Sequence, residues 1–224
     1  MKIERLNLIK VTIPLLIMLL IIFSFMMYGV MTNCHLLKVI DKSSLEWFTQ
    51  CFGHPSRVYE GDILNLYMTF CATVGDVSAV LKLASIVVIC LFIFKNKHQA
   101  IWVLLLMTTG TWINYLIKQT VERQRPYSHL AIDSGWSFPS GHSNASTLLF
   151  LVIMLTIVPV IKVKVIRIII IVTSIIWISI LFCRLYFHAH YLTDVIGGGT
   201  LAVVWVLLFI MAYPLFTLRN NKKN

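Results

Sequence analysis

Six long apolar segments constrain the fold of this chain more than any other feature of its sequence. They are separated by polar stretches and cover about residues 9–30, 74–94, 99–118, 143–161, 165–186 and 193–217. A helix needs about 20 mostly apolar residues to cross a bilayer, and these segments match that requirement. Charged residues make up 12% of the chain, whereas a soluble domain has about a quarter. The sequence therefore predicts an all-α polytopic membrane protein with six transmembrane helices.

The chain is predicted to form one membrane domain with four parts. Residues 1–30 hold a cytoplasmic N-terminus and the first transmembrane helix, which lacks the small-residue cleavage site of a signal peptide. Residues 31–73 form an extracytoplasmic connection, and within it "DKSSLEWFTQCF" has amphipathic helical spacing typical of a helix on the membrane surface. Residues 74–217 form the core of five transmembrane helices, and residues 218–224 are a basic cytoplasmic tail.

The distribution of charge predicts the orientation in the membrane. If the N-terminus is cytoplasmic, that side receives eleven of the nineteen Lys and Arg residues: Lys2, Arg5, Lys10, Lys95, Lys97, Lys162, Lys164, Arg167, Arg219, Lys222 and Lys223. Basic residues are enriched in cytoplasmic loops, so we expect a protein of the cell membrane with both termini in the cytoplasm. The same rule explains the net charge of +10, and no aromatic-rich basic stretch indicates nucleic-acid binding.

The first of three polar patches is "KQTVERQRP", which follows the third apolar segment. Lys118 and Arg125 are seven residues apart, which is two helical turns, so both cations can lie on one face. Pro126 then ends the helix. Taken alone, the pattern is equally typical of cations that reach from a helix end toward the membrane surface.

The second patch is "SFPSGHSNAS", at the start of the fourth apolar segment. Pro139 and Ser140 suit the beginning of a helix. The free N–H groups and positive dipole end of a helix start favour a phosphate. Gly141 would allow the backbone to approach that anion, and His142 would face the same place. Taken alone, a capped helix with an incidental histidine explains this stretch equally well.

The third patch is "LFCRLYFHAHYLTDVIGGG", which joins the last two apolar segments. Arg184 lies at the outer end of the fifth segment. His190 and Asp194 are four residues apart, so they can share one side of a helical turn. An aspartate that accepts from one imidazole nitrogen leaves the other nitrogen basic, as in an activated nucleophile or base. Gly197–Gly199 are expected to allow close helix packing around the site.

The three patches are more informative together than singly, because the distribution of charge places all of them on the outer side of the membrane. They supply three cations, a helix N-terminus, two histidines and a carboxylate. This set can neutralise a phosphoryl group without a metal or another cofactor. The five cysteines contain no CxxC and indicate neither a zinc site nor a redox motif. A pairing of Cys34 with Cys51 stays open, with free thiols the simpler interpretation.

The motifs "K-x6-RP", "PSGH" and "R-x5-H-x3-D" resemble, in order and spacing, the three signature motifs of the type 2 phosphatidic acid phosphatase family. The resemblance covers about residues 60–215. One position departs from the pattern, because the third motif commonly begins with Ser-Arg and this chain has Cys183-Arg184; we expect a small effect. Vanadium haloperoxidases share the site but are soluble, which six predicted spans argue against.

The resemblance implies a metal-independent membrane phosphatase that acts on lipid phosphates through a phosphohistidine. His190 would attack the phosphorus, and Asp194 would orient His190. His142 would protonate the leaving lipid oxygen and then activate water. The residues implied to hold the phosphoryl oxygens are Lys118, Arg125, Ser140, Gly141 and Arg184. His188 is expected to be exposed or to face the lipid headgroup, since no acidic cluster accompanies it to bind a metal.

The expected substrate is undecaprenyl diphosphate, hydrolysed to undecaprenyl phosphate, and membrane lipids are the expected surroundings. Phosphatidylglycerophosphate and phosphatidic acid are near alternatives, because only twelve residues separate Pro126 from Pro139 and leave little loop to specify a headgroup. A lipid phosphotransferase is a second enzymatic interpretation, and an inactive membrane scaffold or transporter is a third. The motifs alone do not choose between hydrolysis and transfer, and they give no oligomeric state.

Overall fold

The structure is a computed structural model that describes residues 2–156 and 163–217. Within these ranges the chain forms eight helices and no strand. The helices are α1 (Lys2–Met31), α2 (His35–Phe52), α3 (Ile63–Val74), α4 (Val77–Ile93), α5 (Lys97–Val121), α6 (Gly141–Thr156), α7 (Val163–Tyr186) and α8 (Leu192–Thr217). The expected all-α class is therefore confirmed for the described part of the chain.

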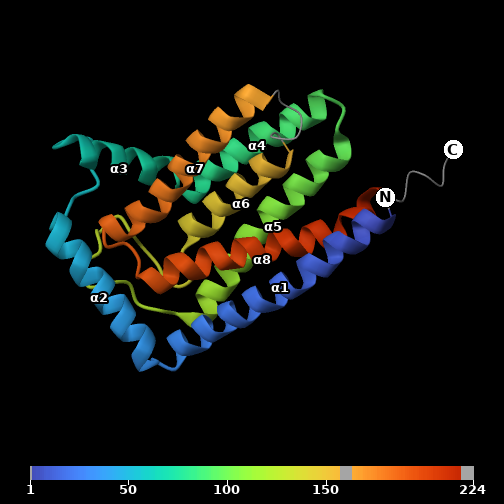
Figure 1. The fold of residues 1–224 in the computed structure, drawn as a ribbon. Coiled ribbons are helices and arrows are strands. Elements are labelled where there is room, and N and C mark those ends of the chain that lie inside the picture. The colour runs from blue at the N-terminus through green and yellow to red at the C-terminus, as the bar shows by residue number, and fades with distance from the viewer. Residues whose placement is uncertain (1, 157–162, 218–224) are drawn as a thin grey trace.

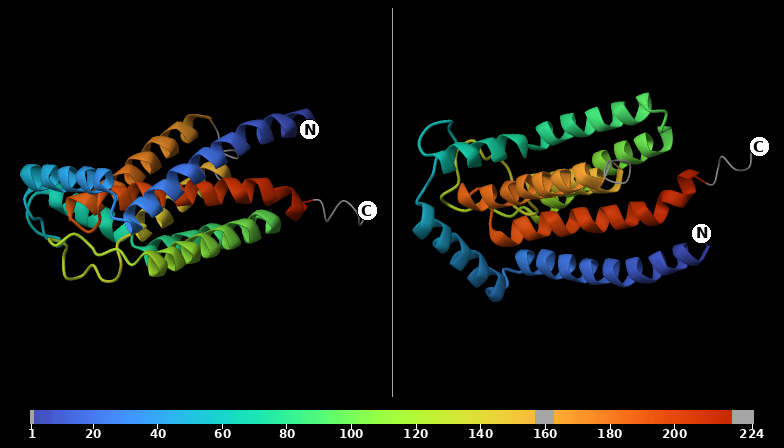
Figure 2. Two further views of the ribbon diagram at one scale, coloured as in Figure 1. Left: turned by 90° about the horizontal axis from the view of Figure 1, so that it is seen from below. Right: turned by 45° about the horizontal axis from the view of Figure 1, so that its top comes forward.

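The helices form an elongated bundle in which α1 lies along α8 (Figure 1). The connections 122–140 and 187–191 gather with α2 at one end of this bundle, which we call the loop end (Figure 2). Helix α1 begins, and α8 finishes, at the opposite end. All three polar patches found in the sequence thus lie at the same end of the molecule.

Within residues 2–156 and 163–217, fewer helices qualify as membrane spans than the six expected. Four helices are long and apolar enough to cross a bilayer: α1 over Val11–Met31, α5, α7 over Val165–Tyr186 and α8 over Leu192–Ala212. A fifth span results if α3 and α4, which are bent by 61° at their junction, act as one. The described part of α6, Gly141–Thr156, has 16 residues, fewer than the roughly 20 that a span requires. Two expected segments lie outside the described residues, namely 157–161 of the fourth span and the basic tail 218–224.

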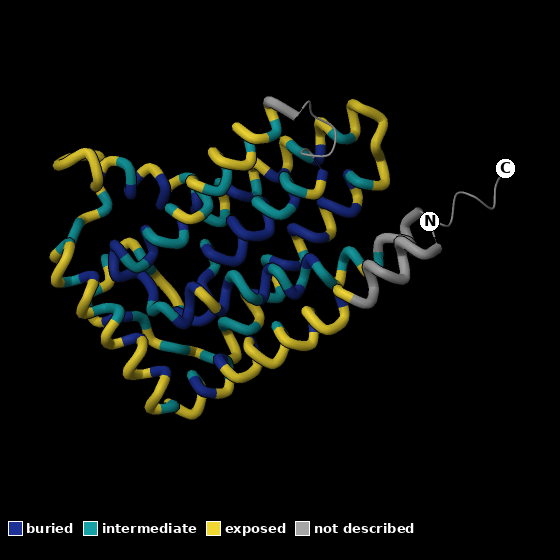
Figure 3. Tube along the Cα trace, in the orientation of Figure 1, coloured by how far each residue is buried: buried dark blue, intermediate teal, exposed yellow. Residues whose placement is uncertain are grey.

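The outer surface of the bundle is apolar along much of its length. In the most apolar window of α7 only 6% of the residues are buried inside the protein, although the mean hydropathy of this span is 2.7. Exposed residues also follow the outer edge of α1 (Figure 3). A soluble monomer rarely exposes such a continuous apolar surface, so these faces are suited to contact lipid.

The core lies between α4, α5, α6 and α8. Its fully buried residues include Leu106 of α5, Leu148 of α6 and Ala202 of α8. Hydrogen bonds between helices supplement this packing: the Trp205 indole donates to Thr109 at 3.0 Å, and other tryptophans make similar bonds. Small residues and interhelical hydrogen bonds are the usual means by which membrane helices associate.

The connection 31–73 is more than an amphipathic segment on the membrane surface. Its first half is the expected helix, α2, but this helix packs against α7 and α8. The residues that α2 buries are Leu37, Asp41 and Phe48. Its second half contains α3, which packs against α7. The burial of Asp41, at 2% exposed, requires a partner inside the protein, since an unpaired buried charge is costly.

Gly198 of α8 marks the closest approach between α8 and the start of α6. A Cβ atom on Gly198 would lie 2.4 Å from the backbone oxygen of Ser140, whereas one on Gly199 would meet nothing nearer than the Thr147 hydroxyl at 3.8 Å. The expectation of close helix packing at these glycines is therefore confirmed at Gly198.

Gly198→Ala should displace the backbone at Ser140, since a backbone atom cannot move aside as a side chain can. Overpacking of this kind costs about 1–3 kcal/mol, so the apparent melting temperature in detergent should fall. Gly199→Ala is the matched control, one residue away on the same helix, and should behave like the wild type. Equal melting temperatures for the two variants would contradict the close packing.

Candidate active site

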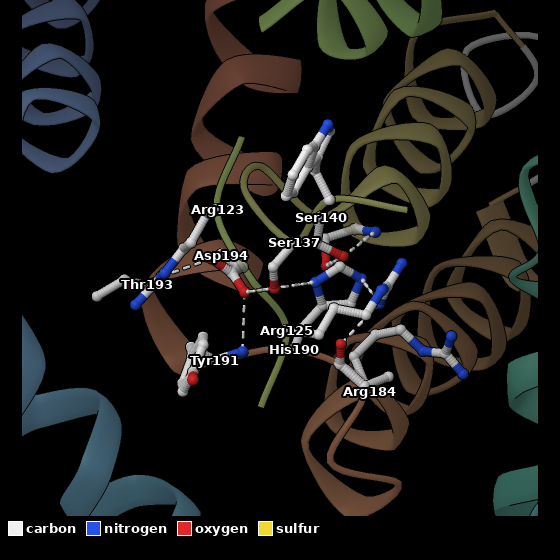
Figure 4. Close-up of polar contacts among 12 residues, drawn as sticks. Arg123, Arg125, Ser137, Ser140, Arg184, His190, Tyr191, Thr193 and Asp194 are labelled. Carbon is white, nitrogen blue, oxygen red and sulfur yellow. Dashed lines mark hydrogen bonds and ion pairs between the residues drawn. The ribbon is translucent and has the colours of Figure 1, made fainter. Parts of the chain in front are cut away.

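The loop end brings all the sequence-predicted site residues into one region. The backbone N–H of Ser140 donates to the carbonyl of Asp194 at 3.0 Å, which ties the second polar patch to the third. The carbonyl of Arg184 accepts from the N–H groups of Ala189 and His190, which folds 187–191 back onto the end of α7. Arg125 reaches the Ala189 carbonyl at 2.7 Å and brings in the first patch. Figure 4 shows the resulting cluster.

His190 presents one ring nitrogen to a carboxylate and the other to a cation. Its Nδ1 lies 3.4 Å from Asp194 Oδ2 and 3.3 Å from the Ser137 hydroxyl. Its Nε2 lies 3.3 Å from Arg125 Nη1. A guanidinium can only donate, so Nε2 acts as the acceptor and the proton of the neutral ring belongs on Nδ1. The ring therefore carries a free electron pair on the nitrogen that faces Arg125.

The protonation of His190 follows from its surroundings. Burial lowers the pKa of His190 to about 3, although the hydrogen bond with Asp194 acts in the opposite direction. The positive charges of Lys118 and Arg125 also disfavour the imidazolium. The ring is thus neutral near pH 7, as a nitrogen nucleophile must be.

Arg184 is a buried cation whose hydrogen-bonding capacity is largely unused. The residue is 0% exposed, yet its Nε and Nη2 have no hydrogen-bond partner among the described residues. Its Nη1 lies 3.1 Å from His142 Nε2, and Asp133 is 3.9 Å away. Buried donors are normally satisfied, and a guanidinium matches the oxygens of a phosphate. The geometry is that of a site prepared for an anion.

Lys118 and Arg125 hold the loop around this site through backbone carbonyls. Lys118 Nζ donates to the carbonyls of Trp136 and Ser137 at 2.6 and 3.2 Å. Arg125 donates to the carbonyls of Ser134 and Gly135, and burial lowers the pKa of its guanidinium. Both cations therefore fix the segment that leads into "PSGH" as well as adding positive charge.

The "PSGH" segment forms the expected helix start, because α6 begins at Gly141. Ser140 is its cap: the Ser140 hydroxyl accepts from the Ser143 N–H at 3.3 Å and from the Ser143 hydroxyl at 2.9 Å. The hydrogen of the Ser140 hydroxyl stays available as a donor. The first N–H groups of a helix lack intrahelical acceptors, so those of Gly141 and His142 can serve an anion.

Arg123 is an important residue that the sequence analysis did not select. Its two terminal nitrogens bridge two buried carboxylates, with Nη1 2.6 Å from Asp194 and Nη2 2.5 Å from Asp41 of α2. Burial opposes its charge, but Asp194 and Asp41 together raise the pKa of Arg123. Its guanidinium also lies 4.2 Å from the centre of the Tyr191 ring. Arg123 thereby connects α2 to the carboxylate that faces His190.

Ser137 was also missed, although it lies within the second patch. Its hydroxyl donates a short hydrogen bond to Asp194 and lies beside His190 Nδ1. Asp194 accepts a further bond from the N–H of Tyr191 at 2.9 Å. No sequence pattern distinguishes Ser137 from the neighbouring serines, since its role depends on contact with a residue 57 positions away.

The expectation that His188 is exposed or faces a headgroup is wrong. His188 is 1% exposed, because α2 covers it. Its Nε2 lies 3.0 Å from the Thr49 hydroxyl, and its ring packs against the His54 ring at a tilt of 42°, with centroids 5.1 Å apart. Burial lowers the pKa of His188. This histidine joins the connection 187–191 to α2.

The cysteines lie apart from the chemistry of the site. All five are free thiols, including Cys34 and Cys51. Cys183, which replaces the usual serine of the third motif, is buried and donates to the Ile180 carbonyl of its own helix. Within the described ranges, no group of three or more His, Cys, Asp or Glu residues could hold a metal ion.

The burial of neutral His190 predicts how stability depends on pH. The unfolded chain takes up a proton at a histidine near pH 6.5, whereas the folded protein does so only near pH 3. Between these values the unfolded state binds more protons, so the free energy of unfolding falls as the pH is lowered. The slope due to His190 is at most about 1.4 kcal/mol per pH unit.

His190→Asn should therefore weaken the loss of thermal stability between pH 7 and pH 5, measured in detergent. The exposed His35→Asn is the control and should keep the wild-type slope. An unchanged slope in the His190 variant would mean that this ring is already charged in the folded protein.

Arg123→Gln should leave Asp41 and Asp194 as unpaired buried charges. Breaking a buried ion pair in this way costs about 3–5 kcal/mol, and the phosphatase activity predicted from the motifs should fall sharply. Adding Asp41→Asn to this variant removes one of the two unpaired charges and should restore part of the melting temperature. Lys42→Gln, whose side chain is 78% exposed, is the control. Similar behaviour of Arg123→Gln and Lys42→Gln would refute the bridging role.

Comparisons with known proteins agree with this geometry. Residues 99–217 match the PAP2 superfamily. Phosphatidylglycerophosphatase B of Bacillus subtilis (strain 168) is 30% identical over 151 residues, which cover 66% of this chain and 73% of that protein. The crystal structure of the first transmembrane PAP2 type phosphatidylglycerolphosphate phosphatase from Bacillus subtilis superposes with a TM-score of 0.69 at 21% identity, over 93% of this chain and 97% of that one.

The sequence match and the shared fold decide the family. The match to the superfamily spans more than half of the chain and contains all three motifs. The structural likeness extends to the N-terminal helices that this match leaves out. The chain belongs to the PAP2 superfamily and is a multi-pass membrane lipid phosphate phosphatase, a phosphomonoesterase.

Proposed function

We propose that this protein hydrolyses phosphatidylglycerophosphate, releasing its terminal phosphate through a phosphohistidine on His190. The observation that carries the chemistry is Arg184, a buried guanidinium with two unused donor nitrogens beside His142. Together with the neutral His190 and its carboxylate, this arrangement supports in-line transfer of a phosphoryl group. The choice of lipid rests on the relatives, both of which are described as acting on phosphatidylglycerophosphate.

In the first proposed step, Nε2 of His190 attacks the phosphorus and the bond to the glycerol oxygen breaks. His142 gives a proton to that oxygen, so phosphatidylglycerol leaves as an alcohol. Asp194 keeps the Nδ1 proton of His190 in place and stabilises the positive ring that forms. Arg184, Lys118 and Arg125 neutralise the phosphoryl oxygens.

In the second proposed step, His142 removes a proton from water and the resulting hydroxide attacks the phosphohistidine. The bond between phosphorus and His190 breaks, and inorganic phosphate leaves. Gly141 and Ser140 assist both steps by donating to the equatorial oxygens from the start of α6. His190 returns to its neutral form, so the cycle closes without a metal.

A cavity between α4, α6 and α7 offers a place for the lipid tail. It has a volume of about 170 Å³ and an almost entirely apolar lining. Ser146 and Ile180 line it, and they lie one helical turn inward from His142 and Arg184. A leaving group that takes its proton from His142 would thus have its hydrocarbon part directed into this cavity.

We further propose six membrane spans and a site at the outer leaflet. The spans would be α1, the bent pair α3–α4, α5, the apolar segment 143–161 that begins within α6, α7 and α8. The excess of Lys and Arg near the start of α1 and the α4–α5 and α6–α7 connections supports placing that end in the cytoplasm. The loop end, with the candidate site, would then face the extracytoplasmic side.

Undecaprenyl diphosphate, the substrate expected from the motifs, has less support than phosphatidylglycerophosphate. The motif residues are expected to contact the phosphoryl group, which all lipid phosphates share. They therefore do not distinguish one lipid from another. A cavity of about 340 Å³ borders the site at Arg125, with Asp133 and Trp136 also in its lining, and offers room for a small headgroup.

A substrate panel on the purified protein tests this proposal. Phosphate release should be fastest on phosphatidylglycerophosphate, at least tenfold above phosphatidic acid and undecaprenyl diphosphate in kcat/KM, and should persist in EDTA. His190→Ala should abolish it, whereas His35→Ala should not. Asp194→Asn should lower kcat by roughly 10⁴, as loss of an orienting aspartate does in a catalytic triad.

Two results would overturn parts of the proposal. A higher kcat/KM for an isoprenyl diphosphate would assign a different substrate to the same site. A labelled phosphate that appears on an added lipid alcohol instead of in solution would indicate a phosphotransferase.

A further inference from the structure

We propose that Asp76 positions His142, so that the site contains two histidine–carboxylate pairs instead of one. Asp76 Oδ1 lies 2.7 Å from His142 Nε2, which is closer than Asp194 approaches His190. This inference rests on the proposed function, in which His142 protonates the leaving group. Asp76 belongs to none of the three motifs and precedes the matched residues 99–217.

The junction between α3 and α4 holds Asp76 in place. Gly75 caps the end of α3, and a Cβ atom there would lie 2.5 Å from the Ile180 side chain of α7, so any larger residue would force Ile180 to shift. On the other side, a Cβ on Gly141 would lie 3.4 Å from Val77. The 61° bend between the two helices therefore packs directly against the start of α6 and against α7.

A second contact fixes the orientation of the Asp76 carboxylate. Arg57 Nη2 donates to Asp76 Oδ2 at 2.7 Å, and the Arg57 side chain is 11% exposed. One carboxylate oxygen is thus held by Arg57 while the other faces His142. Because both oxygens are engaged, rotation of the carboxylate away from the imidazole would cost a charged hydrogen bond.

The contact with Asp76 also determines which nitrogen of His142 can work on substrate. A carboxylate only accepts, so His142 Nε2 carries a hydrogen toward Asp76. Arg184 approaches the same nitrogen at 3.1 Å and is itself a donor, so it repels that hydrogen. Nε2 is therefore committed to Asp76, and Nδ1 is the nitrogen that passes a proton to the leaving oxygen.

The charge of Asp76 is needed because cations surround His142. Arg184 of α7 and Arg57 of the segment before α3 both face this region, and both disfavour a positive imidazole. Asp76 is the carboxylate in contact with the ring and favours its protonated form, as does the negative charge of a bound phosphoryl group. Without Asp76, His142 would lose its proton more readily and would be a poor general acid.

This role predicts a dependence on the leaving group that a structural role would not produce. An alkyl oxygen needs a proton as it leaves, whereas p-nitrophenolate does not. Asp76→Asn should lower kcat on phosphatidylglycerophosphate by about 10²–10³, yet lower the burst of p-nitrophenol from p-nitrophenyl phosphate by less than about threefold. Its effect should match that of His142→Ala on both substrates.

Three further measurements make the test decisive. Asp76→Glu should recover part of the lost kcat, and Glu60→Gln, an exposed carboxylate of the same segment, should leave both reactions unchanged. The alkaline limb of the kcat profile on the lipid should move to lower pH in Asp76→Asn, because His142 then loses its proton earlier. Equal losses on the two substrates, or an unmoved alkaline limb, would overturn the proposal.

Failure of the substrate assignment would be distinguishable from failure of this inference. If the wild type releases phosphate from another lipid instead, the proposed substrate is wrong. The comparison of Asp76→Asn with wild type would then use a lipid monophosphate that the enzyme still turns over, such as phosphatidic acid. Its leaving alkoxide needs a proton, whereas the phosphate leaving group of a diphosphate does not.

Discussion

The buried carboxylate of Asp194 is the group on which the arrangement of the loop end depends. A fully buried charge is tolerated only when it is paired and hydrogen-bonded. Asp194 meets this condition through Arg123, Ser137 and the N–H of Tyr191. These partners come from both connections at the loop end, so satisfying one charge also fixes the position of the segments that surround His190. The position of His190 is then a consequence of this network.

The N-terminal part of the chain adds contacts to the site that the motif residues form. Two carboxylates from outside the matched residues 99–217 contact its charged groups. Asp41 of α2 pairs with Arg123, and Asp76 pairs with His142. Helix α2 also covers His188, next to the loop that carries His190. The segments before residue 99 are therefore part of the active-site scaffold and supply negative charge to a region dominated by cations.

Several cations at the loop end are held before any substrate arrives. Lys118 and Arg125 bind backbone carbonyls of the segment that leads into α6, which fixes their positions. Arg184 is held by burial and keeps unused donors. Donors that are already in place need not reorganise when charge develops on the phosphoryl oxygens, and this preorganisation is a major source of catalysis. Burial, together with this positive charge, keeps His190 neutral and so available as a nucleophile.

The sequence by itself determined the helical class, the grouping of three motifs at one end and the capped start of α6, because hydropathy and helix-cap chemistry are local properties. It predicted six spans, whereas within the described residues four helices, or five with the bent pair α3–α4, are long and apolar enough to cross a membrane. It did not identify Arg123, Ser137 or Asp76, and it misjudged His188. Those residues acquire their roles from partners far away in the chain, such as Asp41, which lies 82 positions from Arg123. Only the tertiary structure decides such contacts, because the free energy of a buried charge depends on what surrounds it and not on its neighbours in sequence.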